Sequence, residues 1–314
     1  MKAADYLSKT ERQEITRRSD WLAARMLLTN WLIVWGAFLL AYYWTNPLTI
    51  LIALCLIAGR LLGIGVIMHE CGHNSFFATK RLNRFFGQWF AGKLVFDNLH
   101  PYAEGHKQHH RLAGTEHDTD RTNYNAYPIE QARLKRKITR DLTGQTGVRF
   151  FAQKIRATAE IFSADPEKRR LAKPYISMWL TQLAFIALLH FTLSAWLYLL
   201  WLGSTLTLYM LVSRVRQIAE HAAVPNALDL DPRMNTRTTY ANFFERLLVA
   251  PNNVNYHLEH HLMASVPAYR LKAFHRLLKE RGAYRETKIF ASYADVLRHV
   301  TTLPTERPDP QLAY

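Results

Sequence analysis

Eight of the fourteen histidines fall in three short clusters whose spacing suits metal binding. The segment HECGH places two histidines four residues apart, on one face of a helix. The segments HKQHH and HLEHH place three at i, i+3 and i+4, again on one face. Neutral imidazole binds Fe, Zn, Cu and Ni, and one tetrahedral ion takes at most four ligands. Two metal ions are therefore predicted, with the candidate ligands His69, His73, His106, His109, His110, His257, His260 and His261.

Two long uncharged segments must position these clusters. Residues 26–59 and 175–213 contain no Asp, Glu, Lys or Arg, and one membrane crossing needs about 20 apolar residues. Each segment is long enough for two crossings, with a turn signal at Thr45-Asn46-Pro47 in the first and Gly203-Ser204 in the second. The sequence predicts an all-α integral membrane protein with four transmembrane helices in two hairpins. Buried core helices of a soluble protein are the alternative, but such runs exceed what a globular core supplies.

The basic residues predict how the chain is oriented. Lys and Arg flank the apolar segments and are absent from the two predicted turns, which places both termini and the middle of the chain in the cytoplasm. The net charge of +15 then reflects topology and contact with anionic lipid, and no aromatic-interleaved basic groove indicates nucleic acid binding. The predicted divisions are a cytoplasmic segment 1–25, a hairpin 26–68, a cytoplasmic segment 69–174, a hairpin 175–213 and a cytoplasmic cap 214–314.

Helix geometry places His69 and His221 near the same boundary of the hydrocarbon layer. If the second crossing starts at Pro47, His69 lies about 33 Å along it, where the helix has just left the hydrocarbon layer. The fourth crossing, starting near Ser204, reaches His221 after about 25 Å, so His221 is a ninth candidate ligand. Arg60 lies about 20 Å along the second crossing and is expected to snorkel to the interface or to contact a polar headgroup.

Two further helices are predicted outside the crossings. Residues 145–162 have apolar side chains at helical spacing among basic ones, as an interfacial helix does. Residues 268–278 are predicted to form a cap helix with Leu271, Phe274 and Leu278 facing inward. The tail after Pro304 is expected to be loosely held.

At the histidine clusters the sequence resembles the membrane fatty acid desaturase and hydroxylase superfamily, whose members carry boxes of the forms HxxxH, HxxHH and HxxHH around a di-iron centre. The matching boxes are HECGH, HKQHH and HLEHH, and the stretch NYHLEHHLMASVPAY is similar to bacterial members. The resemblance extends from the first hairpin to about Leu278. It implies that the eight box histidines and His221 bind iron, within a cytoplasmic helical cap of a bacterial inner-membrane protein.

The resemblance also suggests residues that support the ligands. Gln217, one helical turn before His221, matches an amide that holds a metal-bound water in an acyl-CoA member, with helix packing as the alternative. Four carboxylates near the boxes are candidates to accept an N–H from a ligand imidazole, with solvated surface charges as the alternative: Glu70, Glu104, Asp118 and Glu220. Glu259, between two box histidines, is expected to point off the ligand face.

The activity that the resemblance implies is O2-dependent desaturation of a lipid acyl chain at two iron ions. The first box has three intervening residues, as in acyl-lipid types, and the third opens with His257 where front-end desaturases have Gln. The HPGG haem signature of a fused cytochrome b5 is absent from the sequence. A separate electron donor, a ferredoxin or rubredoxin with its reductase, is therefore expected.

Two alternatives to a desaturase stay open at this stage. A hydroxylase or ketolase of the same superfamily would act on a fatty acid, alkane or carotenoid, because oxygen rebound competes with removal of a second hydrogen. A histidine-rich membrane metal transporter or sensor is the non-enzymatic alternative. Transporters usually place polar ligands near the bilayer midplane, whereas these clusters are predicted outside it.

Overall fold

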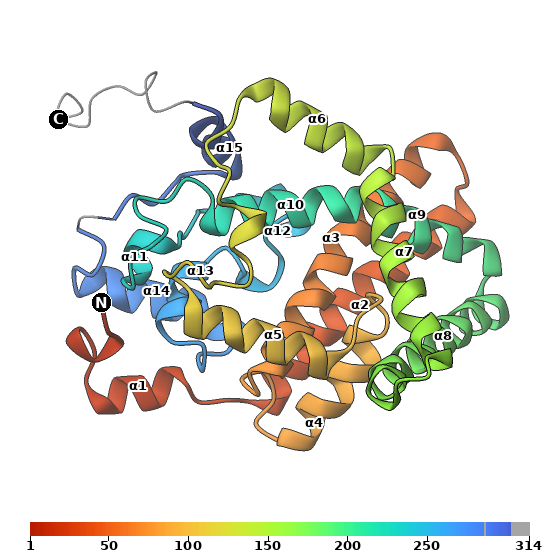
Figure 1. Ribbon diagram of the computed structural model, residues 1–314, viewed down its shortest axis with the longest axis horizontal. Helices are drawn as coiled ribbons and strands as arrows, with labels where there is room; N and C mark the ends of the chain where they lie inside the picture. The colour runs from red at the N-terminus through yellow and green to blue at the C-terminus, as the bar shows by residue number, and fades with distance from the viewer. Residues whose placement is uncertain (286, 303–314) are drawn as a thin grey trace.

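The chain is described from a computed structural model, which covers residues 1–285 and 287–302 and is all-helical over that range (Figure 1). The predicted tail after Pro304 lies outside these residues. The elements, with η for 3-10 and π turns, are η1 (Ala3–Asp5), α1 (Lys9–Ile15), α2 (Asp20–Tyr43), α3 (Pro47–Gly72), α4 (Lys80–Phe85), η2 (Phe86–Gly92), α5 (Leu99–Leu112), η3 (Arg121–Asn123), α6 (Gln131–Leu142), α7 (Gln145–Ala159), η4 (Glu160–Phe162), α8 (Pro166–Thr192), η5 (Ala195–Leu197), α9 (Tyr198–Leu206), α10 (Leu208–His221), α11 (Pro232–Asn235), α12 (Phe243–Leu248), η6 (Pro251–Asn253), α13 (His257–Leu262), α14 (Ala268–Glu280) and α15 (Tyr293–Thr301).

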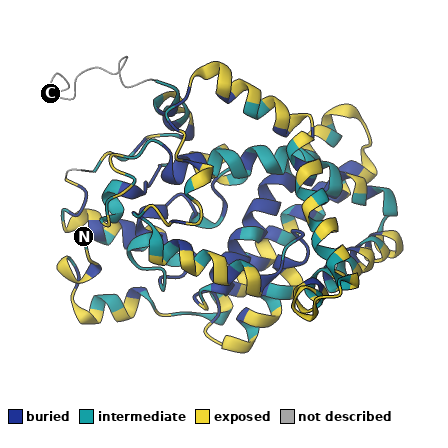
Figure 2. Cartoon of the chain, viewed as in Figure 1, coloured by how far each residue is buried: buried dark blue, intermediate teal, exposed yellow. Residues whose placement is uncertain are grey.

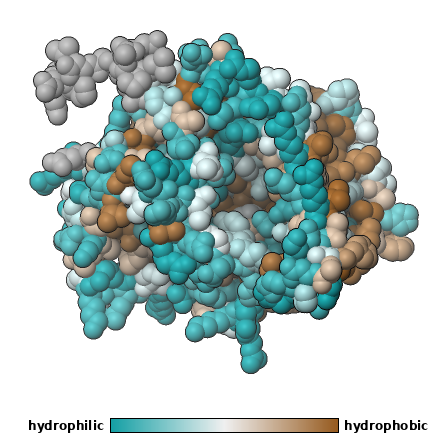
Figure 3. Space-filling view, in the orientation of Figure 1, coloured by the Kyte–Doolittle hydropathy of each residue, from teal (hydrophilic) through white to brown (hydrophobic). Residues whose placement is uncertain are grey.

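Four helical segments in the described part of the chain are long and apolar enough to cross a membrane, as predicted. They are α2, α3, α8 and the run Ala195–His221, which joins η5, α9 and α10. Their outward faces carry exposed apolar side chains such as Leu32, Leu183 and Phe191. In the space-filling view these hydrophobic surfaces gather on the right, over α8 and α9 (Figure 3).

The two predicted turns have different outcomes. The first agrees with the structure: α2 ends at Tyr43 and α3 begins at Pro47, with the Asn46 side chain accepting from the first free N–H groups of α3. The second was wrong, because Gly203 and Ser204 lie inside α9 and the chain turns between α8 and η5 instead. These small residues serve close packing on α3, where the Ser204 hydroxyl donates to the Leu54 carbonyl at 3.0 Å.

Helix α3 forms the centre of the molecule. It packs against α2, η2, α5, α9, α10 and α12, and most of its residues from Ile57 to Gly72 are buried (Figure 2). Close packing on all sides holds side chains in single positions. The last turn of α3, which carries His69, is therefore fixed by its neighbours before any ligand binds.

Arg60 corrects the expectation of snorkelling or headgroup contact. It is 5% exposed, and its guanidinium donates to Asn30 Oδ1 at 3.3 Å and to the Leu247 carbonyl. That carbonyl belongs to the last turn of α12, where helix geometry leaves oxygens without an intrahelical donor. Because α12 packs directly on α3, Arg60 finds its acceptors inside the protein.

The two predicted helices outside the crossings form. In α7, Val148 and Ile155 are exposed while Phe151 packs edge-on against Phe96, with ring centroids 4.7 Å apart. In α14, the inward side chains are buried as predicted. These are Leu271, Phe274 and Leu278.

Gly147 of α7 lies against the backbone of Leu206, and an alanine there is expected to destabilise the fold. An added Cβ would come 2.5 Å from Leu206 Cα and would also meet its carbonyl oxygen, so α7 or α9 would have to move. Overpacking of this kind costs about 1–3 kcal/mol. Gly36→Ala is the matched control, because a Cβ there meets nothing within 4 Å. Thermal unfolding in detergent should show a lower melting temperature for Gly147→Ala alone; equal melting of both variants would contradict the packing argument.

Candidate metal centre

The first two histidine boxes meet where α5 packs on the end of α3. His69 lies in the last turn of α3 and His73 is its C-cap residue. Gly72 lets α5 approach closely, since an added Cβ would lie 3.0 Å from the Ala103 Cβ. As a result the ring centroids of His69 and His106 are 4.3 Å apart, and those of His73 and His110 are 4.9 Å apart.

Five imidazoles form a first group, which we call cluster 1. Their ring nitrogens lie within 4.8 Å of one another, and the Nε2 atom of His110 is 3.0 Å from those of both His106 and His260. The contributing elements are α3 with its cap, α5 and α13. The members of cluster 1 are His69, His73, His106, His110 and His260.

Four imidazoles form a second group, cluster 2, built from α5, α10 and α13. The Nε2 atoms of His221 and His257 are 2.9 Å apart, and those of His109 and His261 are 3.3 Å apart. All four donor nitrogens lie within 4.8 Å of one another. The members of cluster 2 are His109, His221, His257 and His261.

The structure thus brings together all nine histidines predicted from the sequence, and it divides each HxxHH box between the two clusters. In each box the i and i+4 histidines enter one cluster, and the histidine between them enters the other. The clusters adjoin, because the His110 ring of cluster 1 stacks on the His261 ring of cluster 2 at 4.4 Å. This arrangement suits two neighbouring metal ions that share α5 and α13.

Acceptors on the far side of the rings fix their orientation. The Asp118 carboxylate lies 2.7 Å from His109 Nδ1, and the Asn235 carbonyl accepts from His221 Nδ1 at 3.0 Å. Glu220 lies 3.3 Å from His257 Nδ1. A proton held on Nδ1 leaves the Nε2 lone pair free to face the cluster, as in many metal sites where a carboxylate or carbonyl supports the ligand.

The predicted supporting carboxylates divide into three at the site and one away from it. Asp118 and Glu220 contact ring nitrogens as just described, and Glu70 lies 3.2 Å from His69 Nδ1. Glu104 corrects the expectation, because its carboxylate is exposed and lies 3.8 Å from the Arg111 guanidinium. It stands on the solvent side of α5, whereas the three box histidines of that helix face inward.

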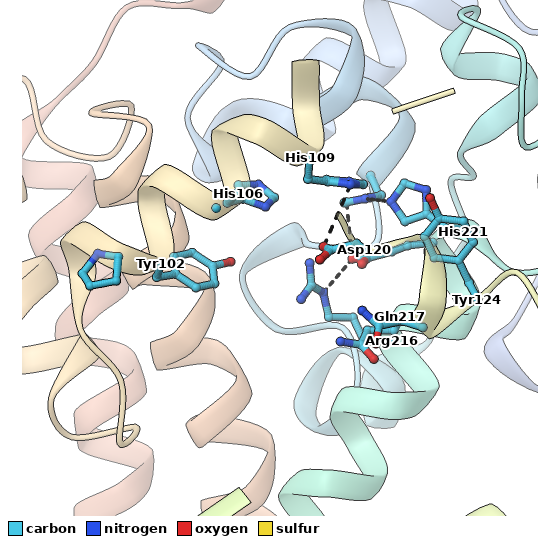
Figure 4. A pocket seen from close by; sticks show the side chains of 13 residues that line it. Tyr102, His106, His109, Asp120, Tyr124, Arg216, Gln217 and His221 are labelled. Carbon is cyan, nitrogen blue, oxygen red and sulfur yellow. Dashed lines mark hydrogen bonds and ion pairs between the residues drawn. The ribbon is translucent and has the colours of Figure 1, made fainter. Parts of the chain in front are cut away.

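Two cavities reach the centre, and Gln217 lines both. The α5–α10 cavity, of about 330 Å³, includes His106, His109 and His221 in its wall (Figure 4). The α3–α10 cavity, of about 270 Å³, runs beside His69. Among the described residues the Gln217 side chain has no hydrogen-bond partner, so its amide is free to contact a molecule in either cavity.

Sequence reasoning missed several residues that contact the clusters. The Tyr124 hydroxyl donates to Asp118, and its ring stacks on His221 at 5.0 Å. Tyr102 stacks on His106 at 5.7 Å with nearly parallel rings. Arg216 Nε donates to Glu220 at 2.6 Å. The i, i+4 spacing of Arg216 and Glu220 was a usable signal, whereas Tyr124 lies in a loop and gave none.

The donor sets fit metal ions. Burial lowers the pKa of His73 to about 4 and that of His110 to about 2, so these imidazoles are neutral at pH 7 and their lone pairs are available. The Nε2 atoms of His69 and His73 are buried without a hydrogen-bond partner among the described residues, a costly state that a bound cation would remove. Ligands about 2.1 Å from one ion at angles of about 90–110° are about 3.0–3.4 Å apart, close to the Nε2 separations observed.

Replacing Asp118 by asparagine is expected to weaken metal binding about 10–100-fold, the usual effect of removing a carboxylate that supports a ligand. Hydrogen bonds from His109 and Tyr124 outweigh burial and lower the pKa of Asp118 to about 2, so it is a carboxylate at pH 7. Metal content after dialysis against graded chelator measures the effect. Asp120→Asn is the control, since that carboxylate is half exposed and 3.9 Å from His109; equal metal retention by both variants would count against the role of Asp118.

Comparison with known proteins agrees with this geometry. The family model for fatty acid desaturases matches residues 45–293. A dihydrorhizobitoxine desaturase of Bradyrhizobium elkanii is 23% identical over 265 residues, which cover 80% of this chain and 72% of that protein. Delta(12) fatty acid desaturases of Mortierella isabellina and Mortierella alpina are 38% identical over 52 residues, 17% of this chain and 13% of each relative. Because the family model spans most of its length, the chain belongs to the fatty acid desaturase family.

Proposed function

We propose that the protein is an O2-dependent di-iron desaturase that introduces a double bond into an unactivated carbon chain. The observation that supports this most directly is the division of nine buried imidazoles into two adjoining groups whose ring nitrogens converge. Five donors in cluster 1 exceed the four of a tetrahedral zinc site, which favours iron. Iron ions bound by the two clusters would supply the oxidising power that amino acid side chains lack.

The chain's own residues have three tasks in this proposal. Asp118, Glu220 and the Asn235 carbonyl hold the imidazoles in the orientation that binds metal. The wall of the α3–α10 cavity, which includes Leu62, Val66 and Met210, holds the carbon chain beside His69. Close packing around α3 limits water at the reacting carbon.

The reaction balances with an external reductant. The CH2–CH2 unit loses two hydrogens, and with two electrons and two protons these reduce one O2 to two waters. A ferredoxin or rubredoxin with its reductase is the proposed donor, reaching a multi-pass protein of the bacterial inner membrane from the cytoplasmic side. The three relatives are all named as desaturases, which favours this outcome over hydroxylation or ketone formation.

Mass spectrometry of lipids and fatty acids from a host expressing the chain in air, with and without a co-expressed ferredoxin system, tests the proposal. A product lighter by two hydrogens than a host component is expected. A product heavier by one oxygen would replace the proposal with hydroxylation. Purified protein that lacks iron and forms product without O2 would overturn the di-iron assignment altogether.

A further inference from the structure

Arg216 has an unused hydrogen-bonding edge beside the metal centre. Its Nε donates to Glu220, while its two terminal nitrogens have no partner among the described residues. The side chain is 18% exposed and lines the α5–α10 cavity (Figure 4). It also lines the α3–α10 cavity. A guanidinium presents paired N–H groups that match the two oxygens of a carboxylate. An enclosed cation of this kind is suited to bind an anion.

Two further donors share the same wall. The Tyr102 hydroxyl and the Gln217 amide line both cavities with Arg216, and within the described part of the chain neither has a hydrogen-bond partner. Tyr102 stacks on His106 of cluster 1, and Glu220 links Arg216 to His257 of cluster 2. The three donors therefore lie next to both clusters. A long acyl chain held by apolar contacts alone would leave all three unsatisfied.

The apolar part of the α3–α10 cavity has a limited length. Its wall follows α3 from His69 back to Leu62, seven residues or about 10 Å of helix. An extended carbon chain advances about 1.2 Å per bond, so this length accommodates about eight bonds.

The other fixed charges around the donors are Glu220 and Asp120 in the α5–α10 cavity and Asp97 in the α3–α10 cavity. Glu220 is already paired with Arg216, and Asp97 is paired with Lys154 at 3.2 Å.

We propose that Arg216, assisted by Tyr102, binds the free carboxylate of a short or medium-length carbon chain whose tail lies in the α3–α10 cavity. This deepens the proposed desaturase function and rests on it for the chemistry at the chain. It names the substrate class as a free carboxylate, oxidised within about eight bonds of its charged end. An esterified glycerolipid has no such charged end to offer.

Calorimetric titration of the purified, metal-containing protein in detergent tests this, with hexanoate and the uncharged hexanamide as matched probes. Wild type should bind hexanoate at least about ten-fold more tightly than hexanamide, the effect of a charge-assisted hydrogen bond. Arg216→Gln should lose that preference, whereas Arg216→Lys should keep part of it because the charge remains. Arg149→Gln is the control: Arg149 lies on the exposed side of α7, so this variant should keep the full preference. Tyr102→Phe should weaken hexanoate binding several-fold with metal content unchanged.

Two results would overturn the proposal. Equal affinity for hexanoate and hexanamide would remove the anion subsite, and hexanoate binding that survives Arg216→Gln would place the carboxylate elsewhere, for example on the metal itself. If Arg216→Gln loses its metal, Tyr102→Phe decides, since it alters no charge. Binding is measured without turnover, so Arg216-dependent hexanoate binding in a protein that makes no desaturated product would overturn the proposed function and leave only the carboxylate subsite standing.

Discussion

His109→Ala is expected to abolish product formation while the protein still inserts into the membrane. His109 supplies one of the four ring nitrogens of cluster 2 and is held in place by Asp118. Removing it leaves three donors and deprives the buried Asp118 carboxylate of its imidazole partner, so the site should lose its ion. We expect activity to fall more than about 100-fold, beyond the loss caused by removing a supporting carboxylate. Product mass spectrometry and metal content per chain measure the two effects.

The division into two clusters sharpens this test. His109→Ala should remove the ion of cluster 2 and leave that of cluster 1, so the metal content should fall from about two ions to about one. His190→Ala is the matched control, because His190 is exposed on α8 and belongs to neither cluster. Full activity in His109→Ala would refute its role as a ligand, and loss of both ions would refute the independence of the clusters.

Glu259→Ala is expected to destabilise the helix that carries the third histidine box. Glu259 is fully buried and accepts hydrogen bonds from the Thr238 and Tyr284 hydroxyls, and His275 Nδ1 lies 2.5 Å from it. Alanine would leave these three buried groups without their acceptor. Each unsatisfied group costs about 1–3 kcal/mol, so we expect a loss of about 3–5 kcal/mol and, with it, weaker metal binding by α13.

Thermal unfolding in detergent and metal retention measure the effect of Glu259→Ala. Glu104→Ala is the control, since an exposed ion pair contributes only about 0–1 kcal/mol and Glu104 contacts Arg111 at the surface. We expect a melting temperature several degrees lower for the Glu259 variant only. Unchanged melting with full metal retention would show that the buried network is dispensable.

Local patterns in the sequence were sufficient to predict the four apolar helices and the nine histidines. A hydrocarbon layer requires a long apolar run whatever surrounds it, and the i, i+3, i+4 spacing sets a helical face within a few residues. His221 followed from helix length and the resemblance together. Glu70, Asp118 and Glu220 were within reach because each lies near a box in the chain.

Only the tertiary structure decided which histidines join which cluster and which groups support them. The split of each HxxHH box between two clusters depends on how α5 and α13 face α3 and α10, which no local pattern encodes. The Asn235 carbonyl at His221 and the Tyr124 hydroxyl at Asp118 come from loops whose paths are set by packing. Arg60 was expected to snorkel to the interface or to contact a headgroup, but it is buried against α12. A buried polar group binds whatever partner the fold brings to it, and that partner can lie anywhere in the chain.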